Sequence, residues 1–576
     1  MRLEELWEQL KPVCELQSLL SFSLEEGFTK NPHKTRKCNL GVNITHWVMH
    51  AQSSKNGDNP EIRLIFFRLL TLLESCFHVV VVFDGPQKPN WMCEAKVDAW
   101  VERLKPGIKE IVEALGFEWR EAPGAADAEL AHLNETGAID VVLTDSPHAC
   151  LFGALTISNN WGHNLPINTG DPLRKGKDDK NHLYVRIVHV NKFSFGTNGA
   201  ISFALCTEEA GLSVFVGTER LREALVDSGL GVRLCDAVRG QSRETIESLL
   251  VDWRKELISF LHRQSNVNSR SLANKIGNLG KSFPNIDLLI SCVDPLTSSS
   301  PNVTVVKGPL AAEPNLGTIA AVCERYFEWG YRDLLIKRFR SLLWPGIVLR
   351  IFLCAAVELD RKTSPPLDDP TTSQSSFITQ KFSSCRENPI NNHSPFFVHI
   401  SQAKPTNNTP AHRVGIKPLI LIRLAEAGLL GTRQPPDKLR DDNVINDSEL
   451  EETQQEPGRI GSPADEQKEL RLRIPAVLTQ LVIPSLVSDL IQEKVAKISP
   501  PTVEPSDNPR GSNSQKAKKG KARQEALPNS KSSCSQPATK SSAKLAGKQR
   551  ALATAAEGSG KITDYFPSSK PQARPN

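Results

Sequence analysis

Three short apolar runs between residues 39 and 144 are each followed by polar side chains that could do chemistry. Asn43 follows NLGV, Asp84 follows VVVVF, and the neighbours Asp145 and Ser146 follow VVLT. If the runs are strands of a parallel sheet, these positions meet in the crevice beyond the strands' carboxyl ends, where α/β proteins place their sites. Acidic side chains converging there could hold a divalent cation, because magnesium prefers oxygen ligands.

Helical segments alternate with these runs. EIRLIFFRLLTLLESC precedes the strand HVVVVF, and the helix PGIKEIVEALGFEW precedes the strand AIDVVLT. In the second helix the apolar positions recur at the spacing of one helix face: Ile108, Ile111, Val112 and Leu115. Because continuous apolar strands suit a sheet buried on both faces, the order predicts an α/β fold with a parallel-sheet core.

Length and composition set the outer limits. The 576 residues are enough for two or three domains, but 39 prolines and a polar final quarter indicate a globular part of about 430 residues and a disordered tail. Lys plus Arg exceed Asp plus Glu by only 70 to 65, so net charge supports a polyanionic partner weakly.

Two features argue against a secreted or membrane protein. The start MRLEELWEQLKPV reads as an amphipathic helix, and no run approaches the roughly 20 apolar residues of a membrane span. Twelve cysteines without a C-x-x-C pair disfavour a zinc site and a disulfide framework. We expect a soluble intracellular protein without a membrane partner or a small-molecule cofactor.

Two segments carry a specific resemblance. VVVVFDGPQKPNW and GFEWREAPGAADAELAHLNETGAIDVVLTDSPHACLFGA resemble the N and I regions of the XPG, flap-endonuclease and Holliday-junction-resolvase family, nearest to its fungal branch. The similarity continues to LAEAGLLGTRQPP and covers about 430 residues. It implies a structure-specific DNA endonuclease, in the nucleus, that acts on branched or flapped DNA.

The resemblance also implies a domain plan. A PIN-like nuclease core with a hairpin region is expected at 1–240, a helical DNA-binding extension at 241–360, and a small chromodomain-like α+β module at 376–432. The remainder, 433–576, should be mostly disordered, with a docking helix at about 470–497 that is broken at Pro484 and a clamp-box-like end at 559–566.

Such enzymes hydrolyse phosphodiesters with two Mg²⁺ or Mn²⁺ ions held about 4 Å apart by a dense carboxylate cluster. At the family's ligand positions this chain keeps Asp84 and has the shorter Asp127 in place of a glutamate. The other positions carry no acid: Asn43, Ala125, Ser146 and His148. The last ligand is expected at Glu208 or Glu209 in an uncertain register.

We therefore expect Asp84 and Asp127 to be the remaining catalytic residues of an eroded metal site. His148 is expected to be a surface imidazole, or, as a less favoured alternative, a soft-metal ligand together with Cys150.

Basic side chains offer two candidate DNA contacts. The first is a segment after Asp84, comprising Lys88, Lys96, Arg103, Lys105 and Lys109, although nearby acidic residues dilute its field. The second is a helical stripe of Arg332, Lys337, Arg338 and Arg340, for which a solvated helix face is the favoured interpretation.

The tail holds two further signals. KAKKGKAR reads as a nuclear-import or nucleic-acid patch, or as solvated charge in a disordered tail. KITDYF resembles a sliding-clamp-binding box whose plug would be Ile562, Tyr565 and Phe566.

Three hypotheses remain open. The first is a family member that binds DNA junctions with weak or no cleavage. The second is an active nuclease with a site rebuilt from Asp84, Asp127, Glu129, Asp145 and Glu208 or Glu209. The third is a non-enzymatic protein that recruits a clamp or chromatin partner through its tail.

Overall fold

The computed structural model divides the chain into two units, Met1–Pro500 and Pro501–Asn576. The residues that it describes lie in the first unit: 5–30, 37–52, 57–93, 95–161, 183–192, 196–206, 221–264, 267–363, 396–405, 409–435 and 468–498.

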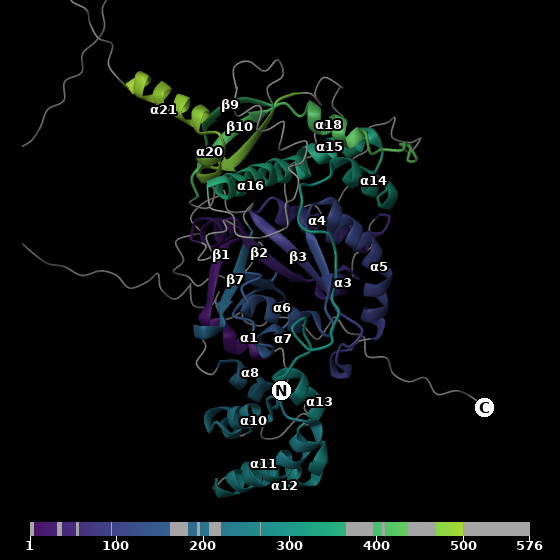
Figure 1. The fold of residues 1–576 in the computed structure, drawn as a ribbon, viewed down its shortest axis with the longest axis vertical. Helices are drawn as coiled ribbons and strands as arrows, with labels where there is room; N and C mark the ends of the chain where they lie inside the picture. The colour runs from purple at the N-terminus through teal and green to yellow at the C-terminus, as the bar shows by residue number, and fades with distance from the viewer. Residues whose placement is uncertain are drawn as a thin grey trace, which may run out of the picture. The chain divides into compact units, whose positions relative to one another are not determined.

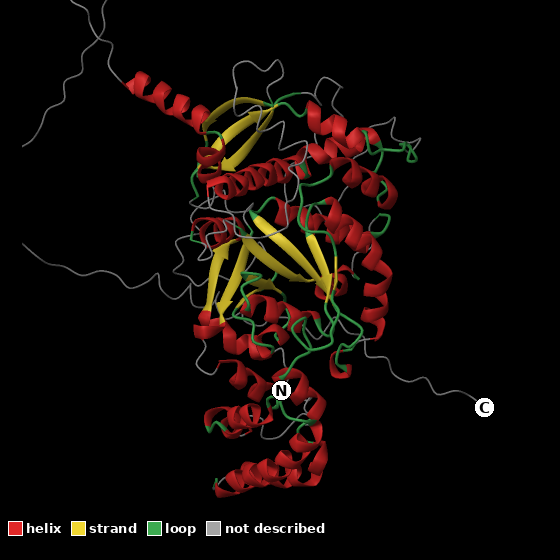
Figure 2. Ribbon diagram, viewed as in Figure 1, coloured by secondary structure: helices red, strands yellow, loops and turns green. Residues whose placement is uncertain are grey.

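An eight-stranded sheet forms the centre of the first unit, in the order β1-β7-β6-β5-β2-β3-β4-β8 (Figures 1 and 2). Its parallel part comprises β4 (Glu118–Glu121), β3 (Phe77–Phe83), β2 (Cys38–Asn43), β5 (Val141–Leu143) and β6 (Thr156–Ser158). Antiparallel strands flank it: β1 (Cys14–Ser18) and β7 (Tyr184–His189) at one edge and β8 (Val306–Lys307) at the other. The predicted α/β fold with a parallel core is confirmed.

Both faces of the sheet are buried, and β3 shows why. All seven of its residues are buried, and because side chains alternate across a strand they feed two separate cores. Phe77, Val79 and Val81 pack into the first core and Val80 and Val82 into the second. A near-continuous valine run is the sequence signature of such a doubly covered strand.

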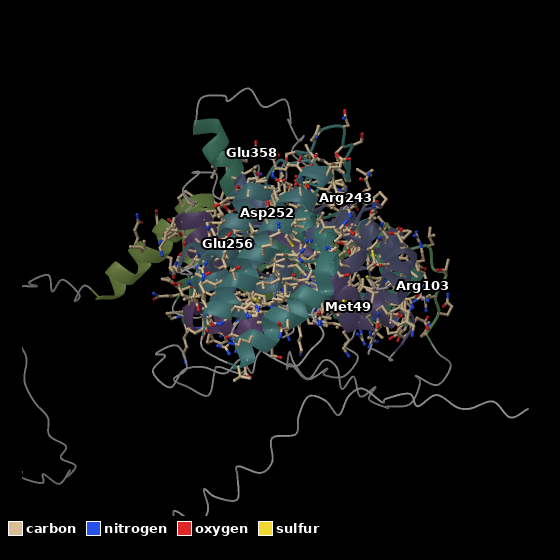
Figure 3. The ribbon with its side chains drawn as sticks, turned by 90° about the horizontal axis from the view of Figure 1, so that it is seen from below. Met49, Arg103, Arg243, Asp252, Glu256 and Glu358 are labelled. Carbon is tan, nitrogen blue, oxygen red and sulfur yellow. The ribbon has the colours of Figure 1, made fainter. Side chains whose placement is uncertain are left out.

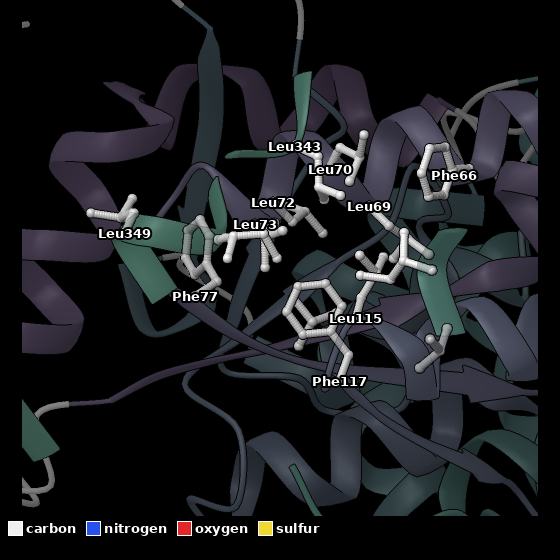
Figure 4. Packing of buried hydrophobic residues seen from close by; sticks show 14 of the residues in the cluster. Phe66, Leu69, Leu70, Leu72, Leu73, Phe77, Leu115, Phe117, Leu343 and Leu349 are labelled. Atoms are coloured by element: carbon white, nitrogen blue, oxygen red, sulfur yellow. The ribbon is translucent and has the colours of Figure 1, made fainter. Parts of the chain in front are cut away.

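Helices from distant parts of the chain cover the first face. They are α3 (Ile44–Ala51), α4 (Pro60–Leu73), α5 (Ala95–Ala114), α14 (Leu316–Tyr326), α15 (Arg332–Leu342) and α16 (Trp344–Thr363). Figure 4 shows Leu69 and Leu73 of α4 gathered with Phe77, Leu115 and Phe117. The helical extension was expected at 241–360, but the buried apolar side chains of α14, α15 and α16 share this core.

The second face is covered by α6 (Ala126–Glu135), α7 (His148–Leu151) and α8 (Gly196–Ala204). Beyond them lie α10 (Leu230–Val238), α11 (Arg243–Arg263), α12 (Val267–Leu279) and α13 (Ile286–Val293) (Figure 1). In α11, Ser242 caps the first turn, and one buried stripe holds the helix to its neighbours: Ile246, Leu250, Trp253, Leu257 and Leu261.

A small module follows, with a three-stranded sheet in the order β11-β10-β9. Its elements are β9 (Phe397–Gln402), β10 (Ala411–Ile416), α18 (Leu419–Glu426), β11 (Leu470–Pro475), α20 (Ala476–Val482) and α21 (Pro484–Ile498). The segment expected to dock as a helix from about 470 thus begins as a strand, because LRLRIP alternates and buries Leu472 and Ile474. The module extends past the expected boundary at 432, and a helix break does occur at Pro484.

Within the described ranges, no single helix has the length and apolarity of a membrane span. Arg332–Leu342 and Trp344–Leu359 meet that criterion only as a pair, bent by 54°.

Two loops at the carboxyl ends of β3 and β4 are held together by their backbones. The Gly85 amide donates to the Gly124 carbonyl at 2.8 Å, and the Gln87 amide donates to the Pro123 carbonyl at 3.1 Å. A Cβ at Gly85 would lie 1.7 Å from the Ala122 carbonyl oxygen, so this close approach requires glycine.

Replacing this glycine should therefore destabilise the fold. We expect Gly85→Ala to lower the free energy of unfolding by about 1–3 kcal/mol or more, because the clash is with backbone and the two loops must separate. Urea denaturation followed by circular dichroism measures the change.

The matched control is Gly277→Ala in α12. A Cβ there meets only the Ile258 Cδ1 atom, at 3.9 Å, so the unfolding free energy should stay level or rise by about 0.5–1 kcal/mol from helix propensity. Equal midpoints for Gly85→Ala and wild type would contradict the proposed close approach of the two loops.

Candidate functional site

Asp84 and Asp127 come together at the carboxyl ends of the central strands. Asp84 directly follows β3, and Asp127 lies in the first turn of α6. The two elements are joined by a hydrogen bond from the Ala126 amide to Asp84 Oδ1, at 2.8 Å. A carboxylate at a helix N-terminus is favourable because it meets free backbone amides and the positive end of the helix dipole.

The second oxygen of Asp84 also has donors from the chain itself. Asp84 Oδ2 accepts from Thr45 Oγ1 at 2.9 Å and lies 3.0 Å from Lys88 Nζ, which also contacts Asp98 Oδ1 at 2.9 Å. Burial alone would lower the pKa of Lys88, but the two carboxylates outweigh it and hold that pKa above its usual value. An ammonium ion is therefore built into the site.

Asp127 is buried and is bonded to a neighbouring amide. Asp127 Oδ1 accepts from Asn43 Nδ2 at 2.8 Å and from Thr144 Oγ1 at 3.3 Å, while Oδ2 lies 4.0 Å from His46 Nε2. The orientation of the Asn43 amide is fixed because its Oδ1 accepts from the Thr45 backbone amide at 3.0 Å. Asn43 therefore caps α3 and donates to Asp127 at once.

Ser146 and His148 bond to each other. Ser146 Oγ lies 2.6 Å from His148 Nδ1, and the ring of Trp91 lies 5.4 Å from the imidazole. Burial lowers the pKa of His148 to about 4, so the ring is neutral at neutral pH. His148, expected as a surface imidazole, is half-buried beside Trp91. Burial also raises the pKa of the Cys150 thiol to about 12, which disfavours a soft-metal pair.

The other candidate carboxylates are bonded elsewhere. Asp145 accepts from the backbone amide of Asn160 at 2.9 Å and from its side-chain amide at 2.5 Å. Glu129, fully buried, accepts from Arg120 at 3.3 Å and from the Ser298 amide at 2.8 Å. Glu208 and Glu209 lie outside the described residues.

The donor set does not fit two divalent ions. Magnesium needs oxygen ligands in near-octahedral geometry, with free lone pairs directed at the ion. Both oxygens of Asp84 and one of Asp127 already accept hydrogen bonds, Asn43 presents an amide donor, and Ala125 presents a methyl group. Among the described residues, no three His, Cys, Asp or Glu side chains gather to hold a metal ion.

Most of the basic residues expected to contact DNA are already paired. Lys88 is held by Asp84 and Asp98 as above. The next three pair with acids of α4, α5 and β4: Arg103 with Glu61 at 3.3 Å, Lys105 with Glu102 and Glu121, and Lys109 with Glu121 at 2.5 Å. Lys109 also lies 3.7 Å from the centre of the Trp119 ring. Lys96 is exposed.

The basic stripe of α15 has a structural task. Arg332 donates to Glu426 at 2.8 Å, and Arg340 donates to the Lys468 carbonyl at 2.7 Å. Arg338 lies over Trp329, 4.9 Å from the ring centre. These interactions link α15 to α18 and to the residue pair before β11, while Arg332 remains exposed and Arg338 and Arg340 are half-buried. The clamp-box residues Ile562, Tyr565 and Phe566 lie outside the described residues.

The sequence did not predict the roles of four site residues: Thr45, Thr144, His46, and Lys88 as a partner of Asp84. A signal existed for two of them. Thr45 follows Asn43 by two residues, the spacing of a side-chain cap, and Lys88 follows Asp84 by four. Nothing local indicated His46 or Thr144, whose neighbour Asp127 comes from another element.

This chain is similar to known proteins in sequence and in fold. The family described as the Holliday junction resolvase Gen1 C-terminal domain matches residues 399–494. The flap endonuclease GEN homolog 1 of Mus musculus is 28% identical over 195 residues, which are 30% of this chain and 20% of the relative. Its counterpart in Homo sapiens is 28% identical over 194 residues, with the same coverage. The matches thus span about a fifth of these relatives.

Solved structures extend the likeness. The junction-resolving enzyme GEN-1 with sodium has a TM-score of 0.54 at 19% identity, over 86% of this chain and 100% of that chain. GEN1 in complex with product DNA and Mg²⁺ has a TM-score of 0.54 at 18% identity, over 85% and 99%. At such identity these structures show the shared fold. The sequence matches and the shared fold are likenesses to junction-resolving and flap endonucleases.

Proposed function

We propose that this protein binds branched or flapped DNA as a structure-specific endonuclease of its family would, with weak or no cleavage of its own. The observation that carries the proposal is the pairing of both site carboxylates with the chain's own donors, Asp84 with Lys88 and Asp127 with Asn43. The fold, the family and the module at 396–498 support the binding half, and the donor set supports the loss of hydrolysis.

The electrostatic argument is one of charge balance. Two divalent ions bring four positive charges, and a nuclease site offsets them with several carboxylates. Asp84, Asp98 and Asp127 supply three negative charges, of which Lys88 already neutralises one. Binding two ions would also require Lys88 to leave and the Asn43 amide to turn away from the Thr45 backbone. Removing one ligand or one supporting residue weakens metal affinity or activity by roughly 10 to 100-fold, and here several are missing together.

The rival interpretations have less support. A site rebuilt from the remaining acids would need Glu129 and Asp145, which are committed to Arg120 and Asn160. Recruitment of a sliding clamp by the tail and a nuclear location rest on tail residues beyond the described ranges, and we keep both as secondary proposals.

Binding and cleavage can be scored together. The full chain, incubated with labelled 5′ flaps and four-way junctions in magnesium or manganese, should shift the DNA and leave it uncut, because the site has too few carboxylates to hold paired ions. Asp127→Asn, which keeps the shape of the side chain, should change neither result. Robust incision by the wild-type protein that disappears in Asp127→Asn would sink the proposal.

Restoring an acid at Asn43 should create a response to metal. Asn43→Asp removes the donor to Asp127 and sets two carboxylates against each other in a buried site, which should lower the unfolding free energy by about 1–3 kcal/mol at neutral pH. Magnesium or manganese should then raise the Tm of this variant by binding its native state, and leave that of the wild type level. Differential scanning fluorimetry with and without metal measures both effects.

Asn134→Asp provides the control. Asn134 is buried too, donating to the Ile139 carbonyl and accepting from the Leu155 and Thr156 amides, so its replacement should destabilise without gaining a metal response. An equal rise in Tm for the wild-type protein with metal would show that the native site holds the ion and would refute the charge argument.

A further inference from the structure

The outer face of the three-stranded sheet carries two arginines directly opposite each other. Arg413 of β10 and Arg473 of β11 are partners in the antiparallel register, and both are exposed. The other face of the sheet is buried, with Val414, Ile416 and Leu472 in the first core. Because side chains alternate across a strand, the two arginines point away from that core. We call Arg413 and Arg473 the arginine pair.

The register brings the two side chains as close as an antiparallel sheet allows. The Ala476 amide donates to the Pro410 carbonyl at 2.8 Å, and hydrogen-bonded and non-hydrogen-bonded positions alternate from there along the two strands. Arg413 and Arg473 therefore form a non-hydrogen-bonded pair, in which the Cα atoms lie about 4.5 Å apart. Like charges directly opposite each other destabilise a sheet, and an anion between them relieves the repulsion.

The neighbouring row of the same face contains such an anion. His399 of β9, Gly415 of β10 and Arg471 of β11 are cross-strand neighbours. Oε1 of Glu469 lies 3.3 Å from His399 Nδ1 and 3.1 Å from Arg471 Nε. A Cβ at Gly415 would be only 2.5 Å from this oxygen, so the glycine makes room for the carboxylate. One carboxylate thus bridges cations from the two outer strands.

The arginine pair has no comparable acid. Neither Arg413 nor Arg473 forms an ion pair or a side-chain hydrogen bond with any residue of the described ranges. Ser401, opposite Arg413 on β9, is half-buried and adds a hydroxyl group to the row. By contrast, two exposed arginines that Figure 3 labels, Arg103 and Arg243, each pair with an acid, at 3.3 and 2.7 Å. The row therefore offers two guanidinium groups and a hydroxyl group to an anion from outside.

We propose that the arginine pair binds a phosphorylated serine or threonine in an extended peptide of a partner protein. A phosphorylated side chain carries about −1.5 to −2 charges at neutral pH and three acceptor oxygens, so one group balances both arginines. The planar guanidinium group matches phosphate with two parallel hydrogen bonds, each roughly twice as strong as a neutral one. An aspartate or glutamate of the partner would leave one of the two positive charges unbalanced.

The open edge of β11 favours an extended peptide over a free phosphate ion. Among the described strands, β11 pairs only with β10. Because Arg473 forms a non-hydrogen-bonded pair with Arg413, its backbone amide and carbonyl point away from β10 toward this edge. An extended segment can add to such an edge through main-chain hydrogen bonds, with every second side chain on the outer face. A phosphorylated residue opposite Arg473 would then lie on the same face as both guanidinium groups.

The size of the face and its one acid argue against a nucleic acid. Three strands of six residues each cover about 10 Å by 20 Å. The Glu469 carboxylate lies in the middle of this area, beside His399 and Arg471. A continuous polyanion crossing the sheet would meet that carboxylate, whereas a single phosphate needs only the row of the arginine pair.

The test measures phosphate-dependent peptide binding by the full chain. The probe is a fluorescein-labelled library of short peptides with a central phosphothreonine and random flanking residues, and its reference is the same library with threonine. Fluorescence anisotropy gives Kd for the wild type, for Arg413→Gln with Arg473→Gln, and for a control, Arg471→Gln with Arg423→Gln. The control removes the same charge from the same module, but from an arginine already paired with Glu469 and from an exposed arginine of α18.

We expect the wild type to bind the phosphorylated library about tenfold or more tightly than the threonine library, because charge-assisted hydrogen bonds are added. The variant without the arginine pair should lose this preference, and the control should keep it. The Tm of the first variant should equal or exceed that of the wild type, because a like-charge pair has been removed. Differential scanning fluorimetry measures the Tm and shows that the variant is folded.

Four results would overturn the proposal. The first is equal binding of the two libraries by the wild type. The second is an equal loss of preference in both variants, which would indicate general charge attraction. The third is a loss of affinity for unbranched duplex DNA, in the variant without the arginine pair, as large as its loss for the phosphorylated library. The fourth is binding that appears only after the acidic residues between 437 and 456 are replaced by their amides, which would make the chain's own segment the occupant.

Discussion

The organisation of the site depends on the junction between the end of β3 and the start of α6. Gly85 lets the loop after β3 approach the Ala122 carbonyl, and the Ala126 amide bonds to Asp84. These two links fix the first turn of α6 against the strand, so that Asp127 arrives at the end of β2 and meets Asn43 at 2.8 Å. Without these two backbone contacts, Asp84 and Asp127 would have no fixed distance from each other or from their hydrogen-bond donors.

Once the acids are placed, charge decides what the pocket can hold. A buried carboxylate is tolerated only when it is paired or hydrogen-bonded, and a nuclease meets that need with metal ions. Here the chain meets it with Lys88, Thr45, Asn43 and Thr144. The chain itself therefore supplies hydrogen-bond donors to Asp84 and Asp127 and sets the Lys88 ammonium beside Asp84.

The strands and the positions of two site residues could be predicted from the sequence, because burial imposes a local pattern. Contacts between distant elements impose no such pattern. Residues buried on both faces of a sheet must be apolar, so β3 could be predicted from its valine run. The ends of the predicted strands then placed Asn43 and Asp84 at the site. Partners from distant elements could not be predicted: Asn43 and Thr144 meet Asp127 only in the fold. The four-residue spacing of Asp84 and Lys88 was a local signal, but spacing alone did not distinguish an ion pair from a phosphate ligand. His148 looked exposed because nothing local indicates that Trp91 packs beside it. β11 was missed because its six residues pair with β10, over fifty positions earlier.

That late pairing makes the small module sensitive to where the chain is cut. β10 is the middle strand of its sheet, bonded to β9 on one side and to β11 on the other. A shortened transcript that ended between residues 435 and 468 would lack β11 and α20, and would leave β10 with an open row of amides and carbonyls. Exposed edges of that kind recruit other strands, so truncated forms would tend to aggregate.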